Sequence, residues 1–312
     1  MNFEAFHADN KNNAVVVSAV PEATKQQPCM LGIDEAGRGP VLGPMVYACA
    51  YCPLKDEQSL KELGFADSKT LTEGKREELF KEANNRAEWL GWMLRVISPT
   101  VICNSMLNIC KYSLNAVSHE AAMALIRGAL DSGVNVKQVY VDTVGPVDKY
   151  QAKLEAAFPD LTITVAKKAD ATFPIVSAAS ICAKVARDNV TSQWYFPEGI
   201  SDEDYGSGYP GDPVTQKFLL QSMDSVFGFS SFVRFSWMTA DKILQERASA
   251  VSWPKEDESG QSIRAFLKRC SDGTSKAAPK SQFFEHRLLH QKPSCFPKRH
   301  PHGRYCHHLR GI

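Results

Sequence analysis

The chain lacks the features that would mark a membrane or secreted protein. No stretch approaches the ~20 consecutive apolar residues of a membrane-spanning helix. The N-terminus, with Glu4, His7 and Asp9, lacks the basic-then-apolar order of a secretory signal. With 312 residues and 44% hydrophobic content, the chain is nevertheless long enough to bury a full core. We therefore expect an intracellular enzyme-sized protein with no membrane partner.

Recognisable zinc modules and paired cysteines are also missing. Nine cysteines, an odd number, are scattered along the chain, which favours reduced thiols in an intracellular protein. Cys49 and Cys52 have Cys-x-x-Cys spacing, but no second pair follows at zinc-ribbon spacing, so we interpret them as core thiols. The histidines near Cys295 and Cys306 likewise match no zinc module.

The chain has little net charge, +1, but that charge is spread unevenly. Residues 255–312 contain 12 Lys and Arg against 5 Asp and Glu, which leaves 24 basic and 30 acidic residues in the rest. An acidic body is not typical of a simple electrostatic nucleic-acid binder. It is compatible with a hydrolase that keeps several carboxylates for metal, and equally with an ordinary soluble enzyme.

The most informative stretch runs from residue 31 to 44, Leu-Gly-Ile-Asp-Glu-Ala-Gly-Arg-Gly-Pro-Val-Leu-Gly-Pro. It predicts a strand, a functional turn and a second strand. Neighbouring side chains of a strand point to opposite faces, so we expect the strand to end at Asp34 and the turn to bring Glu35 round. Gly37 and Gly39 let backbone amides approach a ligand closely. Carboxylates beside such amides suggest a metal ion next to a phosphate or sugar; the alternative is a tight turn with solvated acids.

Residues 34–40, Asp-Glu-Ala-Gly-Arg-Gly-Pro, resemble the signature of the type 2 ribonucleases H. These enzymes cut RNA paired to DNA, including single ribonucleotides embedded in DNA. The resemblance extends over roughly residues 28 to 250, and the later blocks resemble the eukaryotic catalytic subunit more than the bacterial monomer. Those blocks follow in the family's order: Asp67-Ser68-Lys69, Asp142, Asp170, Ser177 to Asp188, and Asp204 to Pro210.

The periodicity of the chain predicts a mixed sheet with helices on its faces. The first strands follow one another closely and favour an antiparallel meander, and a strand–helix–strand unit then indicates a right-handed parallel crossover. This is the ribonuclease H-like fold class, followed by a C-terminal helical extension. We expect strands at about 29–35, 43–52, 89–98, 137–142 and 161–166, and helices at about 72–83, 113–131, 147–158, 174–194, 213–224 and 235–250.

Composition and pattern divide the chain into four parts. Residues 1–27 are polar and irregular and are expected to form a flexible arm. The catalytic domain is expected over 28–212 and the helical extension over 213–254. Beyond that, residues 255–312 are rich in Ser, Lys, Pro and His, which predicts a disordered basic tail.

Four acids are candidates for both catalysis and metal binding: Asp34, Glu35, Asp142 and Asp170. Four carboxylates in one crevice repel each other and raise one another's pKa, and divalent cations relieve that repulsion. Because all-oxygen ligands select Mg²⁺ or Mn²⁺, we interpret the set as a two-metal phosphodiesterase site, with the ions roughly 4 Å apart and Asp34 and Asp142 as central ligands. For any single acid, the alternative is a surface charge or a helix cap.

The resemblance also assigns residues to the substrate. Selectivity for RNA requires a contact with the 2′-hydroxyl, which the resemblance assigns to the backbone of Gly37, Arg38 and Gly39. It implies that Tyr209 packs against the sugar and that Lys69 contacts a phosphate. The alternatives are an ordinary loop aromatic and a solvated lysine.

The function implied is an endoribonuclease that hydrolyses the RNA strand of RNA–DNA hybrids. It would also cut 5′ of single ribonucleotides in duplex DNA, leaving 3′-hydroxyl and 5′-phosphate ends, during replication and repair in the nucleus. The resemblance implies a heterotrimer with two noncatalytic accessory subunits docked on the C-terminal helices. One alternative is a noncatalytic nucleic-acid-binding subunit that keeps the fold; another is a hybrid-cutting enzyme that needs runs of ribonucleotides.

Overall fold

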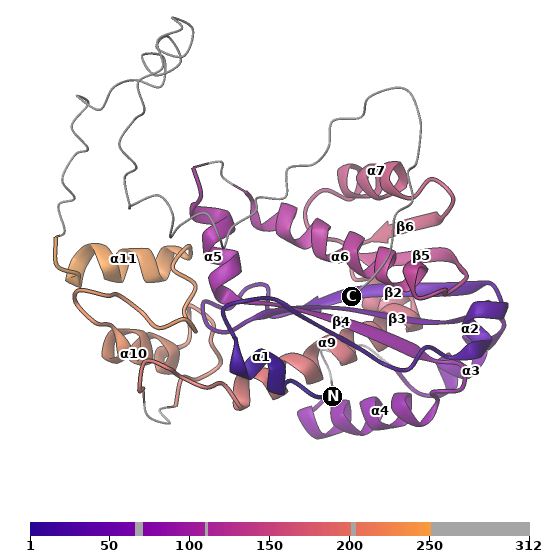
Figure 1. Ribbon diagram of the computed structural model, residues 1–312, viewed down its shortest axis with the longest axis horizontal. Coiled ribbons are helices and arrows are strands. Elements are labelled where there is room, and N and C mark those ends of the chain that lie inside the picture. Colours follow the sequence, from indigo (N-terminus) through magenta and orange to yellow (C-terminus); the bar gives the residue numbers. More distant parts are fainter. Residues whose placement is uncertain (66–70, 110–111, 201–203, 251–312) are drawn as a thin grey trace, which may run out of the picture. The chain divides into compact units, whose positions relative to one another are not determined.

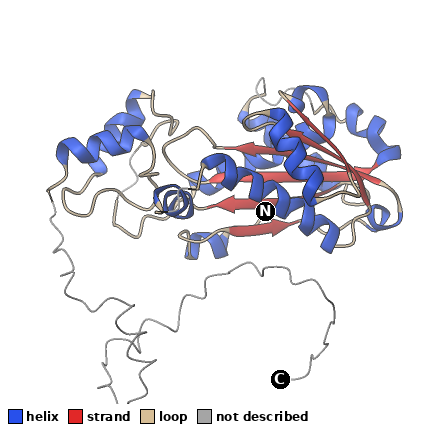
Figure 2. Ribbon diagram, turned by 90° about the horizontal axis from the view of Figure 1, so that it is seen from above, coloured by secondary structure: helices blue, strands red, loops and turns tan. Residues whose placement is uncertain are grey.

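A six-stranded mixed sheet organises the fold (Figures 1 and 2). The computed structural model describes residues 1–65, 71–109, 112–200 and 204–250. The strand order is β1-β4-β3-β2-β5-β6. The strands are β1 Ala14–Val17, β2 Cys29–Ala36, β3 Met45–Pro53, β4 Gly91–Ile97, β5 Val136–Asp142 and β6 Thr162–Ala166.

Two kinds of strand pairing meet at β2, the strand that carries Asp34. On one side, β2, β3 and β4 form an antiparallel meander, and the edge strand β1 pairs antiparallel with β4. On the other side, β2, β5 and β6 run parallel. The predicted fold class is therefore confirmed, and the carboxyl ends of β2, β5 and β6 lie at one edge of the sheet.

Helices cover both faces of this sheet, α6 and α7 on one face and α4 and α9 on the other (Figure 1). The apolar stripe predicted for residues 113–131 is buried in the first layer. The helices are α1 Glu4–Ala8, α2 Glu22–Gln26, α3 Glu57–Glu62, α4 Glu73–Asn85, α5 Pro99–Leu107, α6 Leu114–Asp131, α7 Val147–Ala157, α8 Ala169–Thr172, α9 Pro174–Ser192, α10 Pro213–Ser222 and α11 Met238–Arg247, with a 3₁₀ turn at Leu54–Asp56.

Helix α9 packs closely on the centre of β2 because both elements carry small residues there. A Cβ atom on Gly32 would lie 2.5 Å from the carbonyl oxygen of Ile175 and 2.6 Å from the nitrogen of Val176. The Ser-Ala-Ala-Ser segment 177–180 is fully or almost fully buried at the same contact. This close approach brings the N-terminal half of α9 next to the acid that follows Gly32 by two residues.

The N-terminal residues 1–27 are not the free arm that their polarity predicted. They contain α1, β1 and α2. Phe3 and Phe6 are buried, and the Phe6 ring lies 5.9 Å from the Trp194 ring. Burial of two aromatic rings and the pairing of the valine-rich strand β1 with β4 outweigh the polar composition of the segment.

Other sequence-based expectations concern cysteines, membrane helices and the tail. Cys49 and Cys52 are buried free thiols, which confirms their interpretation as core residues. Within the described ranges, none of the helices combines the length and the apolar character needed to cross a bilayer. The predicted disordered tail, residues 255–312, lies outside the described residues.

Candidate active site

The site forms where the carboxyl ends of β2 and β5 lie side by side. The parallel register pairs Ile33 of β2 with Val141 of β5, so Asp34 and Asp142 occupy the next position on each strand. Neighbouring strands lie about 4.8 Å apart. Since Ile33 and Val141 are both in the core layer beneath α6, the alternation of side chains turns Asp34 and Asp142 towards the opposite layer, that of α9.

The expected end of the first strand at Asp34 is wrong. Strand β2 continues to Ala36, with Asp34 opposite Ala48 and Glu35 opposite Tyr47. Asp34 and Glu35 therefore lie on opposite faces of the sheet, as regular strand geometry requires. Antiparallel pairing with β3 holds the backbone extended through both acids, so no turn brings Glu35 to the side of Asp34.

The remaining two acids are joined by the backbone of the β6–α8 turn. The backbone N–H of Ala169 donates a 2.9 Å hydrogen bond to Oδ1 of Asp142. Asp170 follows in the first turn of α8 and is 4% exposed. Because α8 runs directly into α9, Asp170 comes from the same layer that faces Asp34, and its charge acts on Asp34.

Burial and mutual repulsion shape the electrostatics of the acids. Burial is the main cause that raises the pKa of Asp34 to about 7. A hydrogen bond with the Ser180 hydroxyl lowers the pKa of Asp34, while the charges of Asp142 and Asp170 raise it. The site therefore holds more negative charge than the chain's own groups neutralise at physiological pH.

Glu35 carries the same signature on the other face of β2. Burial, followed by the charge of Asp34, raises the pKa of Glu35 to about 8, and Arg38 only partly opposes them. Oε2 of Glu35 is buried with no hydrogen-bond partner, and the hydroxyl of the adjacent Tyr47 has none of good geometry either. A buried carboxylate oxygen in this condition is suited to receive a cation.

The donor set fits a divalent cation such as Mg²⁺ or Mn²⁺, which prefers carboxylate oxygens. The four acids influence one another's pKa across the end of β2. In the described part of the chain, no three Asp, Glu, His or Cys side chains already form a closed metal-binding arrangement. This is consistent with Asp34 and Glu35 lying on opposite faces, so the acids flank the strand end from two sides.

Beyond β2, the turn that contains Gly37, Arg38 and Gly39 is fixed through its carbonyl groups. The fully buried guanidinium of Arg234 donates to the carbonyl oxygens of Gly37 at 2.6 Å, Arg38 at 3.1 Å and Gly43 at 2.9 Å. Burial lowers the pKa of Arg234 to about 9. Three carbonyl groups offset part of the cost of burying this charge.

Trp237 completes this support and orients the backbone of the turn. Its indole N–H donates to the carbonyl of Gly39 at 3.0 Å, and the Arg234 guanidinium lies 4.8 Å from its ring centroid. In a trans peptide the N–H points opposite to the preceding C=O. The N–H groups of Arg38 and Gly39 therefore point away from Arg234, and neither has a hydrogen-bond partner among the described residues.

Tyr209 lies against the exposed side of the same turn. A Cβ atom on Gly39 would be only 3.1 Å from Cε1 of the Tyr209 ring, so glycine is needed for this contact. The ring remains 54% exposed. The N–H groups of Val41 and Leu42 also donate to the carbonyl of Gly208, at 2.8 and 3.4 Å, which ties the two loops together.

The Arg38 side chain is anchored in the protein. It donates to Asn115 and Ser118 of α6, and its charge lowers the pKa of Glu35. Arg38 therefore links the turn to the α6 layer on the side of Glu35. The sequence indicated the backbone of this residue as a substrate contact, whereas the side chain is a support for the turn.

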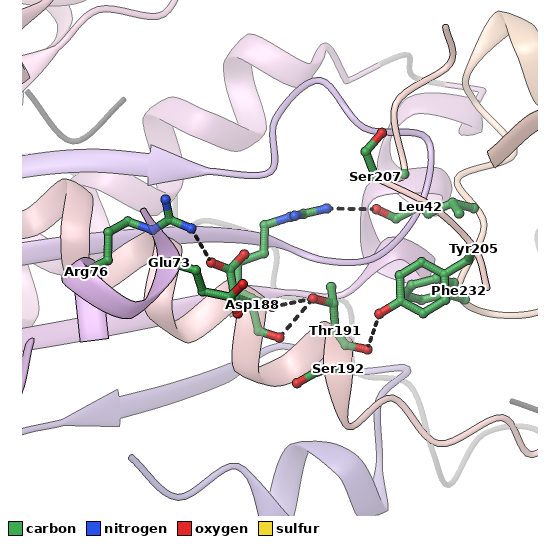
Figure 3. A pocket seen from close by; sticks show the side chains of 12 residues that line it. Leu42, Glu73, Arg76, Asp188, Thr191, Ser192, Tyr205, Ser207 and Phe232 are labelled. Carbon is green, nitrogen blue, oxygen red and sulfur yellow. Dashed lines mark hydrogen bonds and ion pairs between the residues drawn. The ribbon is translucent and has the colours of Figure 1, made fainter. Parts of the chain in front are cut away.

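A polar cavity of about 310 Å³ lies behind the turn (Figure 3). Arg187 separates it from Gly37, because a Cβ on Gly37 would clash with the Arg187 side chain. Arg76 and Asp188 in its wall form a 3.0 Å ion pair. With Arg76 and Arg187 matched by Glu73 and Asp188, the lining charge is balanced and selects no anion.

The structure brings together all but one of the predicted site residues. Lys69 lies outside the described residues. The sequence analysis missed Arg234, Trp237 and Arg187. A signal for the first two was present: residues 232–237, Phe-Val-Arg-Phe-Ser-Trp, place one arginine within an aromatic run, which is unusual unless the arginine is buried with partners.

Comparison with known proteins agrees with this arrangement. Residues 31–240 match the family model for ribonuclease HII. The chain is 49% identical over 284 residues to the catalytic-type A protein of Homo sapiens ribonuclease H2, covering 90% of this chain and 95% of that protein. It is 56% identical over 241 residues to its Caenorhabditis elegans counterpart, covering 75% and 81%. The crystal structure of ribonuclease H2 from Pyrococcus horikoshii OT3 superposes with a TM-score of 0.60 at 32% identity, covering 70% of this chain and 98% of that one.

Proposed function

This chain belongs to the ribonuclease HII family and is a ribonuclease H, and we propose that it cuts at single ribonucleotides in duplex DNA as well as in RNA–DNA hybrids. Cleavage would occur 5′ of the ribonucleotide and leave 3′-hydroxyl and 5′-phosphate ends. Such an activity serves ribonucleotide excision and RNA primer removal. Its alternative, a noncatalytic subunit that keeps the fold, is disfavoured because all four acids are present.

The observation that carries the proposal is the contact of Tyr209 with Gly39 beside two free backbone donors. The N–H groups of Arg38 and Gly39 face away from Arg234 and can donate to a 2′-hydroxyl, the group that distinguishes RNA from DNA. The half-exposed Tyr209 ring provides a surface for the adjoining sugar. One ribose is enough for both contacts, so a run of ribonucleotides is not required.

Hydrolysis is assigned to the four acids at the strand ends. We propose that Asp34 and Asp142 hold two divalent cations between them and that Glu35 and Asp170 complete the set. When bound, the cations supply a nucleophilic water and neutralise charge on the leaving 3′ oxygen. The chain's own groups fix the acids: the Ala169 N–H holds Asp142, and the Glu35 N–H donates to Oδ1 of Asp34 at 2.8 Å.

The turn and the acids together define which phosphodiester is cut. Strand β2 leads directly from Asp34 and Glu35 into the turn that contacts the ribose, with only Ala36 between them. The distance from the recognised sugar to the acids is therefore set by a few residues of rigid backbone. Such a fixed offset positions a single bond next to the ribose for in-line attack.

We also propose two noncatalytic accessory subunits and a location in the nucleus. Helices α10 and α11 and the turn between them leave Leu220, Phe227 and Met238 exposed, Phe227 at 86%, and exposed apolar groups of this kind suit a protein partner. Chromosomal DNA and its replication intermediates supply both substrates in the nucleus. We expect the isolated chain to be poorly active or poorly soluble until the partners are added, as gel filtration and activity assays can measure.

One cleavage assay tests the specificity. The purified enzyme is given three duplexes of one sequence, with no ribonucleotide, one ribonucleotide or four consecutive ribonucleotides. We expect Mg²⁺-dependent cleavage 5′ of the lone ribonucleotide and within the run, and none of the DNA duplex. Cleavage of the run alone would show an enzyme that needs consecutive ribonucleotides and would overturn the single-ribonucleotide proposal.

A further inference from the structure

The turn between β6 and α8 contains an unusual backbone conformation. Lys168 has φ 55° and ψ 43°, in the left-handed region. Every other residue with positive φ in the described ranges is glycine. A lysine pays a steric cost for this conformation that glycine avoids, and strained residues of this kind concentrate at functional sites.

Lys168 stands next to the backbone that links two of the acids. The residue after it, Ala169, donates its N–H to Asp142 at 2.9 Å, and the N–H of Ala171 donates to the carbonyl of Lys168 at 3.0 Å. Asp170 is two residues further along the chain. The turn is therefore held firmly, and it places Lys168 within the immediate surroundings of the acids.

The strand order puts Lys168 on the far side of the acids from Tyr209. The turn contacted by Tyr209 connects β2 to β3, whereas β5 and then β6 lie beyond β2 in the other direction. With strands about 4.8 Å apart, the end of β6 is about 10 Å from the end of β2. A backbone with a 3.4 Å rise per nucleotide covers that distance in about three nucleotides.

The charge of Lys168 has no partner in the protein that explains it. Its side chain is exposed, and no ion pair of Lys168 occurs among the described residues. A cation held at the rim of a carboxylate cluster, with no acid paired to it, suits the phosphates of a polyanion. Phosphate contacts fix the register of a duplex on a protein without reading its sequence.

We propose that Lys168 contacts a backbone phosphate of the substrate duplex on the side of the acids opposite Tyr209. This rests on the duplex substrate proposed above and adds a second anchor to it. The two anchors lie on either side of the scissile bond: Tyr209 and the turn hold the ribose, and Lys168 holds the backbone within about three nucleotides of the acids. Lys168 is a positioning residue, since it does not touch the reacting atoms.

The left-handed conformation also serves to place Ala169 and Asp170, so the test must separate backbone from charge. Lys168→Gly and Lys168→Asn keep a residue that tolerates this conformation but remove the ammonium group. Lys168→Arg keeps the positive charge. The neighbouring Lys167, equally exposed but without positive φ, provides the matched control as Lys167→Ala.

Binding is measured by fluorescence anisotropy on a duplex with one ribonucleotide, in an Asp34→Asn background that leaves the duplex uncut. We expect Lys168→Gly and Lys168→Asn to reduce the slope of log affinity against log salt by about 1. Affinity should fall roughly eightfold at 0.1 M salt and approach that of the parent near 1 M. Lys168→Arg should bind like the parent, and Lys168→Gly should melt no lower than the parent.

Three results would overturn the proposal: parent-like slopes in the Gly and Asn variants, an equal loss in Lys168→Arg, or an equal loss in Lys167→Ala. Lowered melting temperatures in both the Gly and Asn variants would also overturn it, because they would assign the residue to folding. Cleavage by the unmodified enzyme keeps the two proposals distinguishable. If that enzyme fails to cut the duplex, the proposed function fails; if it cuts and the Lys168 variants bind normally, only the Lys168 contact fails.

Discussion

The acid half and the turn half of the active site are built in opposite ways. Asp34 and Asp142 sit at the ends of two hydrogen-bonded neighbouring strands, so the sheet ladder itself sets their separation. The turn with Gly37 and Gly39 is held instead by Arg234 and Trp237, which lie nearly 200 residues away in the sequence. The metal chemistry therefore belongs to the core of the fold, whereas sugar recognition depends on a few contacts from the C-terminal part of the described chain.

This difference implies that the two halves can be damaged separately. A change in an acid removes charge from a rigid sheet end and leaves the turn in place. A change in Arg234 or Trp237 loosens the turn and leaves the acids on their ladder. Substitutions in the two halves should therefore give different combinations of lost cleavage, altered specificity and altered stability.

The largest effect is expected from Asp34→Asn. Loss of a central metal ligand removes several kcal/mol of transition-state stabilisation, so cleavage should fall by more than about a thousandfold. The fold should survive and gain stability, because a buried acid with a raised pKa is replaced by a neutral side chain. Cleavage assays in Mg²⁺ together with thermal melting check both results.

Asp142→Asn should behave in the same way, whereas Asp148→Asn provides a control. Asp148 is an exposed acid in the first turn of α7, and its substitution should leave cleavage near the parental rate. Robust Mg²⁺-dependent cleavage by either Asp34→Asn or Asp142→Asn would contradict the two-metal assignment.

The same contrast explains what could be predicted from the sequence. Strand bounds, the parallel crossover and the four acids were predictable, because apolar periodicity and strand-end acids are local signals. Most predicted strand ends agree with the observed ones to within two residues. The supports of the turn were not predictable, because Arg234 gains its role only from carbonyl groups that folding brings to it.

Two errors have the same physical origin. Glu35 was expected to turn round to the side of Asp34, but pairing with Tyr47 keeps β2 extended, and pairing of that kind cannot be read from one strand alone. Residues 1–27 were expected to be a free arm, but Phe6 finds Trp194, a partner distant in sequence. In both cases a tertiary contact overrides the local signal.

The next largest effect is expected from Arg234→Lys, which tests the turn half. Lysine keeps a positive charge but lacks the planar fork that reaches three carbonyls. Loss of one or two charge-assisted hydrogen bonds should lower the free energy of unfolding by about 2–4 kcal/mol. Cleavage at a single ribonucleotide should fall more than cleavage within a ribonucleotide run.

Denaturant unfolding and the ratio of the two cleavage rates measure these effects. Arg247→Lys is the matched control, because Arg247 is an exposed arginine at the end of α11. An unchanged ratio of the two rates in Arg234→Lys would show that the turn does not depend on this guanidinium.

A smaller effect is expected from Tyr209→Ala. Loss of an aromatic surface for a sugar or base costs about 1–3 kcal/mol, which corresponds to roughly a ten- to hundredfold loss of rate or slightly more if expressed in the transition state. Cleavage at single ribonucleotides should fall while Mn²⁺ binding, measured by calorimetry, is retained. The loss should depend little on base sequence, because a ring on a sugar reads shape. If the variant cuts a lone ribonucleotide as fast as the parent, Tyr209 is only a loop aromatic and the specificity rests on the glycine turn.

The smallest effect concerns pH and distinguishes the halves without changing the turn. The pKa of Asp34 is about 7 in the folded protein against 3.8 ordinarily, and that of Glu35 is about 8 against 4.5. Both values are raised on folding, so the folded state binds more protons than the unfolded state between these limits. Stability from these groups is therefore fully present below about pH 4 and is lost as pH rises towards 8.

In chelator, the melting temperature of the parent should thus fall between pH 5.5 and pH 8.5 by more than that of Asp34→Asn, in which one raised carboxyl is absent. The comparison between parent and variant matters because other groups titrate equally in both. Added Mg²⁺ or Mn²⁺ should reduce the fall in the parent, because a cation stabilises the ionised carboxylates and its binding displaces their protons. Tyr209→Ala should follow the parental curve, since the turn half contributes no raised carboxyl. Parallel pH curves for parent and Asp34→Asn would show that the Asp34 carboxyl is already compensated by the protein, and the need for a cation at the sheet end would lose its electrostatic basis.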